Sequence, residues 1–87
     1  MRWVRYLAEF YLPGDRVDLA ELARQARAAA KRSCCAGRPA VRLLCAIHVP
    51  QDESCFAVYD ASSAEAVAAA GALAGIVFDR IVTAITG

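Results

Sequence analysis

The stretch AVRLLCAIHVPQDESCFAVYDA, residues 40–61, decides the fold of this chain. Residues 40–49 and 55–61 are two apolar runs rich in branched and aromatic side chains, and the polar segment PQDES (50–54) separates them. Such runs predict β-strands, and a short polar loop between them predicts that the strands pair as an antiparallel hairpin. The other elements can be placed around this hairpin.

The segments on either side of the hairpin each predict one strand and one helix. Residues 3–12 and 76–85 are apolar and rich in branched or aromatic side chains, so they predict the first and last strands. Residues 18–32 predict an amphipathic helix that starts with a capping-box spacing. The motif SSAE (62–65) opens an alanine-rich helix that extends to about Leu73.

The order of these elements defines the fold class. The order β-α-β-β-α-β is the split βαβ pattern of a ferredoxin-like α+β fold, a four-stranded antiparallel sheet with two helices on one face. The 87 residues form one small domain, which we assign to residues 1–87. A domain of this size buries roughly 60–65% of its unfolded surface. Because 59% of the residues are hydrophobic, we expect another surface to cover part of the chain, most simply a second copy.

The composition disfavours several classes of function. A net charge of +1 argues against a chain that binds mainly nucleic acid or an anionic membrane. No apolar run reaches the roughly 18 residues of a membrane span, and charges interrupt the first eleven residues, so we expect no membrane contact and a cytoplasmic protein. The four cysteines are then expected as thiols, and their spacing contains no CxxC pair.

The hairpin loop sets the register of its two strands. If Val49 pairs with Ser54 across the four-residue loop, His48 lies directly opposite Cys55. Side chains in this position have Cβ atoms about 4.5–5.5 Å apart. An imidazole and a thiolate at that distance could share one metal ion.

The apolar pattern then predicts which face of the sheet carries this pair. We expect Phe56 and Val58 to lie on the same face as the apolar row of the second strand and to face the helices, which places His48 and Cys55 on the open face. That apolar row consists of Leu43, Cys45, Ile47 and Val49. The fold pairs the first strand with the third, and Glu9 belongs to the less apolar row of the first strand. Glu9 would therefore share the open face. A sheet-to-sheet homodimer would cover that face, so two chains would line any site on it.

Three segments carry a resemblance to a known family. YLAEFYLPG (6–14), VPQDESCFAVYDASSAEAV (49–67) and AGIVFDRIVTAI (74–85) resemble a family of small bacterial proteins described as a domain of unknown function or as nickel-binding proteins. The resemblance runs from the first predicted strand to the last. It implies the ferredoxin-like fold in a dimeric α/β-barrel arrangement, a homodimer, and a bound divalent metal, with nickel in first place.

The resemblance also implies a set of metal ligands. The residues that match or approximate the family's acidic and cysteine positions are Glu9, Asp52, Glu53 and Cys55. Ala57 stands where members often carry a second cysteine, so this chain has one thiolate fewer, and His48 could compensate. The predicted ligands are His48, Cys55 and Glu9, with Asp52 and Glu53 as outer candidates.

Each of these residues also has an ordinary structural interpretation. His48 would be an interface histidine, Cys55 a small packed hydrophobe, and the acidic loop a solvated hairpin tip. Cys45 is expected to pack in the core. The adjacent Cys34 and Cys35 could bind a soft metal or form a strained vicinal disulfide, or they are inert.

Together the residues and the resemblance predict a small cytoplasmic divalent-metal-binding homodimer that sequesters or delivers nickel, copper or zinc. Metal affinity would fall as the pH drops and the ligands become protonated. The motifs GxSxG, HExxH and the glycine-rich phosphate loop are absent, which disfavours an enzyme. The alternative is a dimeric α/β-barrel small-molecule-binding protein or a cofactor-independent enzyme of the monooxygenase type. The nearly nonpolar second helix predicts a further protein interface.

Overall fold

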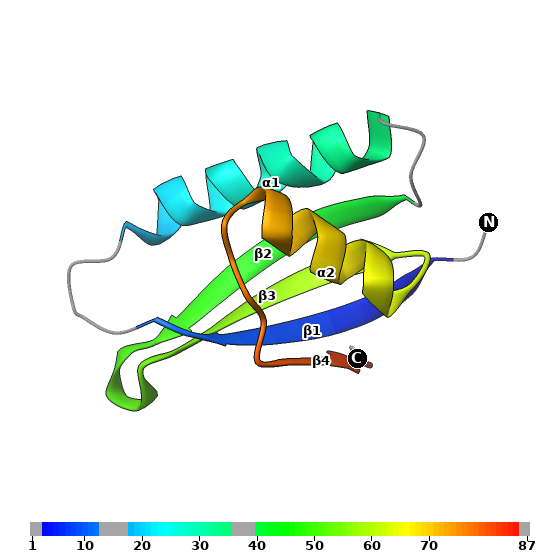
Figure 1. Cartoon of the computed structure of the whole chain (residues 1–87). Helices are drawn as coiled ribbons and strands as arrows, with labels where there is room; N and C mark the ends of the chain where they lie inside the picture. The colour runs from blue at the N-terminus through cyan, green and yellow to red at the C-terminus, as the bar shows by residue number, and fades with distance from the viewer. Residues whose placement is uncertain (1–2, 13–17, 36–39, 86–87) are drawn as a thin grey trace.

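A computed structural model describes residues 3–12, 18–35 and 40–85 and has the predicted β-α-β-β-α-β order (Figure 1). The strands are Val4–Tyr11 (β1), Val41–Val49 (β2), Ser54–Ala61 (β3) and Arg80–Thr83 (β4). The helices are Leu19–Cys35 (α1) and Ala64–Leu73 (α2), and a short 3-10 helix, Pro50–Asp52 (η1), lies in the hairpin loop. The sheet is antiparallel with the order β2-β3-β1-β4, and both helices pack on one face. The ferredoxin-like α+β fold is therefore confirmed.

Both helices begin at side-chain caps, of which the sequence predicts Asp18; the second helix is capped by Ser63 and not by Ser62 of the predicted SSAE capping box. The backbone N–H of Glu21 donates to Oδ1 of Asp18 at 3.0 Å, and the N–H of Ala66 donates to Oγ of Ser63 at 3.2 Å. These bonds satisfy amide groups that the first helical turn leaves unpaired. The Glu21 carboxylate does not close a capping box, because it accepts a hydrogen bond from Arg24 instead. Neither described helix is long and apolar enough to cross a membrane.

The last strand is shorter than the sequence pattern predicted. The predicted strand over residues 76–85 is wrong, because β4 spans only Arg80–Thr83. The N–H of Ile76 donates to the carbonyl oxygen of Gly71 at 2.8 Å, so the chain first folds back on the end of α2. Gly75, with a φ of 77°, makes this turn in the left-handed conformation that glycine favours.

The core between the sheet and the helices is built largely from small side chains. Its buried small residues are Ala8, Ala26, Ala30, Cys55, Ala57, Ala61, Ala66 and Ala70. Three aromatic rings fill the space beside them. The ring of Phe78 packs edge-on against Phe10 and Tyr59, with centroid distances of 5.7 and 6.0 Å. Tyr59 is the largest fully buried side chain of the described residues, so the small residues and the aromatic rings fill the core together.

A β-bulge in β2 changes which side chains face the helices. Leu43 pairs with Tyr59, and Cys45 pairs with Val58, so Leu44 is left out of the register. One extra residue in a strand exchanges the two faces beyond it. Leu43 is buried in the core, whereas Cys45 is exposed on the open face. The expectation that Cys45 packs in the core is therefore wrong.

The contact between Gly71 and Phe78 gives a test of this core. A Cβ atom at Gly71 would overlap the Phe78 ring, and that ring packs against Phe10 and Tyr59. Gly71→Ala is therefore expected to lower the free energy of unfolding by about 1–3 kcal/mol, although alanine is the better helix former. Urea denaturation measures the change. Adding Phe78→Leu should recover part of the loss, and Ala72→Ser on the exposed side is the control. A Gly71→Ala protein as stable as wild type would contradict this packing.

Candidate functional site

The hairpin places His48 directly opposite Cys55, as the loop length predicted. Val49 pairs with Ser54, and the next pair along the strands is His48 with Cys55. The loop is closed by η1 and by Glu53, which has the left-handed φ of 53°. Directly opposed residues have Cβ atoms about 4.5–5.5 Å apart. The imidazole and the thiol are therefore neighbours.

This pair lies under the helices, so its predicted place on the open face is wrong. Cys55 is fully buried and belongs to the same row of β3 as Ala57 and Tyr59, which are also buried in the core. Because strand residues alternate between faces, Phe56 and Val58 lie on the open face. The covered row of β3 therefore holds the small Cys55 and Ala57 and the large Tyr59, and Phe56 and Val58 lie outside.

The surroundings of the pair are apolar. Within the sheet, Cys55 lies between His48 of β2 and Phe10 of β1. Burial raises the pKa of the Cys55 thiol, and a backbone hydrogen bond from Phe56 opposes this rise. Nε2 of His48 is buried and has no hydrogen-bond partner among the described residues. A buried polar atom without a partner costs about 1–3 kcal/mol, so this nitrogen is available as a ligand.

Glu9 lies on the other face of the sheet. It pairs with Phe56 of β3 and with Arg80 of β4, and its Oε1 is 3.8 Å from Nε of Arg80. The sheet therefore separates the Glu9 carboxylate from the thiol of Cys55. The expectation that Glu9 shares a face with His48 and Cys55 is wrong.

Asp52 and Glu53 lie in the exposed hairpin loop. The hydroxyl of Tyr11 donates to Oε2 of Glu53 at 3.2 Å, which holds this carboxylate beside the open face. The negative charge of Glu53 raises the pKa of Tyr11. Within residues 3–12, 18–35 and 40–85, no three His, Cys, Asp or Glu side chains gather closely enough to hold a metal ion. The side chains of Cys34 and Cys35, the second predicted thiol site, lie outside the described part of the chain.

The open face is apolar at its centre and charged towards both ends. No helix packs on it (Figure 1). Its apolar residues are Trp3, Leu7, Cys45, Ile47, Phe56, Val58 and Val82. Trp3 and Ile47 are each 49% exposed. A continuous apolar surface with a polar rim is typical of an interaction surface.

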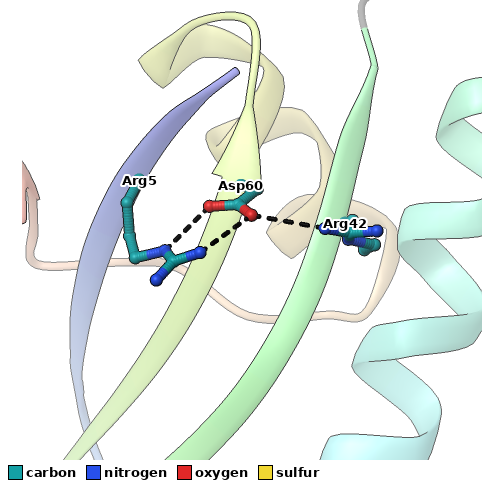
Figure 2. Close-up of polar contacts among 3 residues, drawn as sticks. All are labelled: Arg5, Arg42 and Asp60. Atoms are coloured by element: carbon teal, nitrogen blue, oxygen red, sulfur yellow. Dashed lines mark hydrogen bonds and ion pairs between the residues drawn. The ribbon is translucent and has the colours of Figure 1, made fainter. Parts of the chain in front are cut away.

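Two arginines share one carboxylate at one end of this face (Figure 2). Asp60 of β3 lies opposite Arg5 of β1 and Arg42 of β2. Arg5 donates Nε to Oδ1 at 2.9 Å and Nη2 to Oδ2 at 3.1 Å, and Arg42 donates Nη2 to Oδ2 at 3.4 Å. The Arg42 guanidinium also lies over the Trp3 ring, 5.6 Å from its centroid. The cluster carries one positive charge in excess.

The same contacts set the protonation of Asp60. The hydrogen bonds from Arg5 hold the pKa of Asp60 below its usual range, and Arg42 adds to the effect against the opposing effect of desolvation. The Asp60 side chain is only 11% exposed, so water screens these contacts weakly. Sequence reasoning missed the cluster. The predicted hairpin register could not reveal it, because pairing counted from Val49 and Ser54 sets Asp60 opposite Leu43, and only the bulge at Leu44 brings Arg42 there.

Comparisons with known proteins were made for the whole chain. No protein-family model, curated protein or solved structure matches it. The resemblance to the nickel-binding family therefore stays a prediction. What the structure establishes is the ferredoxin-like fold, the His48–Cys55 pair under the helices, and the uncovered apolar face.

Replacing Asp60 tests the arginine cluster. Asp60→Asn is expected to lower the free energy of unfolding by about 1.5–3 kcal/mol at pH 7, the range for hydrogen bonds to charged groups. The pKa of Asp60 is lower in the folded state than its ordinary value of 3.8. The stabilisation is therefore fully present above that ordinary value and is lost as the pH falls through the lower folded-state value. Chemical denaturation at a series of pH values measures the difference.

The control for this titration is Glu21→Gln. Hydrogen bonds from Arg24 and Gln25 also lower the pKa of Glu21, but that carboxylate lies on the surface of α1. Its replacement should change the stability little at pH 7. If the difference between wild type and Asp60→Asn stays constant from neutral to strongly acid pH, the ionised Asp60 does not stabilise the fold.

Proposed function

We propose that the chain binds a soft transition-metal ion through His48 and Cys55. The observation that carries this proposal is the cross-strand pair, in which a buried Nε2 without a described partner lies beside a fully buried thiol. Nickel, copper and zinc accept imidazole and thiolate ligands. A bound ion would give Nε2 a partner and would stabilise the thiolate form of Cys55, which burial alone disfavours.

The number of ligands bears on the choice of ion. Glu9 lies on the opposite face, and Asp52 and Glu53 lie in the exposed loop, so one chain offers two well-placed ligands. Structural zinc sites use four protein ligands. A two-ligand site suits an ion that accepts low coordination, as copper in its reduced form does. Thiolate ligands also favour copper in this form, so reduced copper is the first ion to test, with nickel and zinc beside it.

The proposed role is sequestration or delivery of the ion in the cytoplasm. A site with two ligands exchanges its ion more readily than a closed four-ligand site, which suits delivery. The alternative role, binding or converting an organic molecule, needs a cavity. The described residues enclose no such cavity, so no observation favours that alternative.

Metal retention tests this proposal. We would equilibrate reduced, tag-free protein separately with copper, nickel and zinc, desalt it, and measure the metal content. Wild type should retain a stoichiometric amount of at least one ion, and both His48→Ala and Cys55→Ser should lose it. Cys45→Ser and Glu9→Gln are matched controls, because they change the same types of ligand on the open face and should retain the ion.

A second readout separates loss of a ligand from loss of the fold. Circular dichroism and thermal unfolding of the metal-free variants show whether each one folds. A sulfur-to-metal charge-transfer band should be present in Cys45→Ser and absent from Cys55→Ser. Retention that survives both His48→Ala and Cys55→Ser would overturn the proposal and point to Cys34 and Cys35. A wild-type protein that retains no ion would overturn it as well.

The proposal includes a second copy of the chain on the open face. Along β3, the covered row includes the small residues Cys55 and Ala57, while the larger Phe56 and Val58 lie outside. A flat face of a four-stranded sheet with strands of about eight residues has an area on the order of 500 Å². The protruding side chains add to this area. A standard protein interface buries about 800 Å² per partner. The face is thus of a suitable size and character for a small homodimer.

A charge at the centre of the open face should break this homodimer. Ile47 is 49% exposed, so Ile47→Glu should leave the monomer folded while it disrupts the apolar contact. Analytical ultracentrifugation should show a dimer for wild type and a monomer for Ile47→Glu. Val77→Glu is the control, because Val77 is 87% exposed and lies outside the sheet, in the segment between α2 and β4. A wild-type protein that stays monomeric at high concentration would refute the homodimer.

A further inference from the structure

We infer that the His48–Cys55 pair selects a monovalent soft ion, such as copper(I), over the divalent ions of nickel and zinc. This inference rests on the metal binding proposed above and names the class of ion that the site takes. It follows from the charge of the two ligands, from the residues beside them in the sheet, and from the apolar core around them.

The two ligands carry one negative charge between them. On binding, the ion replaces the proton of the Cys55 thiol, and the imidazole of His48 is a neutral ligand. A monovalent ion therefore exchanges one positive charge for another, and the loaded pair is neutral. A divalent ion releases the same single proton, so it leaves the loaded pair with one positive charge in excess.

The core around the pair contains no charge that would neutralise this excess. Cys55 is fully buried. The side chains by which α1 packs against the same core are apolar: Leu19, Leu22, Ala23, Ala26 and Ala30. Within the described part of the chain, the core cluster contains no carboxylate, because Glu9 lies on the other face and Asp52 and Glu53 lie in the exposed loop. An uncompensated charge is costly in apolar surroundings, so this core disfavours a divalent ion.

Two alanines occupy the positions where further ligands would lie. Ala46 pairs with Ala57, two residues along the strands from the pair of His48 and Cys55. Residues two apart on a strand lie on the same face, roughly 7 Å from each other. The four residues therefore mark the corners of a rectangle on the covered face. Structural zinc sites and square-planar nickel sites use four ligands, whereas two of these corners carry only methyl groups.

Buried side chains also keep water from replacing the missing ligands on the inner side of the pair. Ala57 follows Cys55 along the covered row of β3, and Phe10 lies opposite Cys55 on β1, and both are buried. Ala46 is half-buried on β2, which is an edge strand of the sheet. It is therefore the corner where a further ligand can be added with the smallest disturbance of the core.

Ion competition in a protein with one cysteine tests this inference. Cys34→Ser, Cys35→Ser and Cys45→Ser leave Cys55 as the remaining cysteine. This protein is equilibrated separately with silver(I), zinc and nickel, and also with silver(I) in the presence of excess zinc, and its metal content is measured after desalting. Silver(I) is the probe because it is a monovalent soft ion that is stable in air. The protein should retain silver(I) in a stoichiometric amount, with and without zinc, and should lose zinc and nickel.

Ala46→Cys on the same background should change this selectivity. A second thiolate adds a ligand beside the pair and neutralises the excess charge of a divalent ion. The variant should therefore retain zinc in a stoichiometric amount. Ala46→Ser is the matched control, because it adds a hydroxyl of similar size without a charge and should not retain zinc. Circular dichroism shows whether both variants fold.

The outcomes separate this inference from the proposed metal binding. Stoichiometric zinc or nickel in the single-cysteine protein would overturn the selectivity and leave metal binding by the pair standing. A folded Ala46→Cys protein that loses zinc would overturn the explanation by charge and ligand number. The competition between silver(I) and zinc needs neither variant, so it decides the class of ion even if Ala46→Cys does not fold. A single-cysteine protein that retains no ion would overturn both proposals.

Discussion

The register shift in β2 is the constraint on which the placement of the candidate site depends. Before the bulge, Leu43 faces the helices, and beyond it Cys45 faces the open side while His48 faces the helices. Strict alternation would instead keep Cys45 covered and turn His48 outwards. The bulge carbonyl of Leu44 accepts a hydrogen bond from Nη2 of Arg27 at 3.4 Å, so α1 provides a partner for the irregular backbone. The extra residue thus fits both the sheet and the helix above it.

Alternation and loop length made the register predictable, whereas the two faces could not be assigned in the same way. The pairing of His48 with Cys55 follows from the hairpin loop, which is a local feature. The prediction matched Phe56 and Val58 to the apolar row of β2, which strict alternation keeps on one face from Leu43 to Ile47. The bulge at Leu44 breaks that row, so Ile47 and Phe56 lie on the open face while His48 and Cys55 lie under the helices. A bulge at Leu44 has no glycine to mark it in the sequence.

Part of the candidate site could be predicted from residues close together in the sequence, and part depends on contacts between strands that are distant in the sequence. The pair of His48 and Cys55 was found from the sequence because the hairpin is contiguous. The place of Glu9 depended on the face assignment and failed with it. The cluster around Asp60 joins strands distant in the sequence, and only the combined register of β1, β2 and β3 reveals it. A register counted from the hairpin loop without the bulge sets Asp60 opposite Leu43, so this cluster could not be found from the predicted strand pairs.

The predicted metal site and the predicted dimer surface were both expected on the open face of the sheet, but in the structure they lie on opposite faces. If His48 and Cys55 lay on the open face, a second copy would cover them, and metal binding would depend on the dimer. Under the helices, the pair belongs to one chain, and in our proposal a second copy covers the open face alone. Cys55 and Phe56 are adjacent along β3 but lie on opposite sides of the sheet. In our proposal, β3 therefore contributes Cys55 to the metal site and Phe56 to the dimer surface. Substitutions can abolish metal binding without breaking the dimer, or break the dimer without abolishing metal binding.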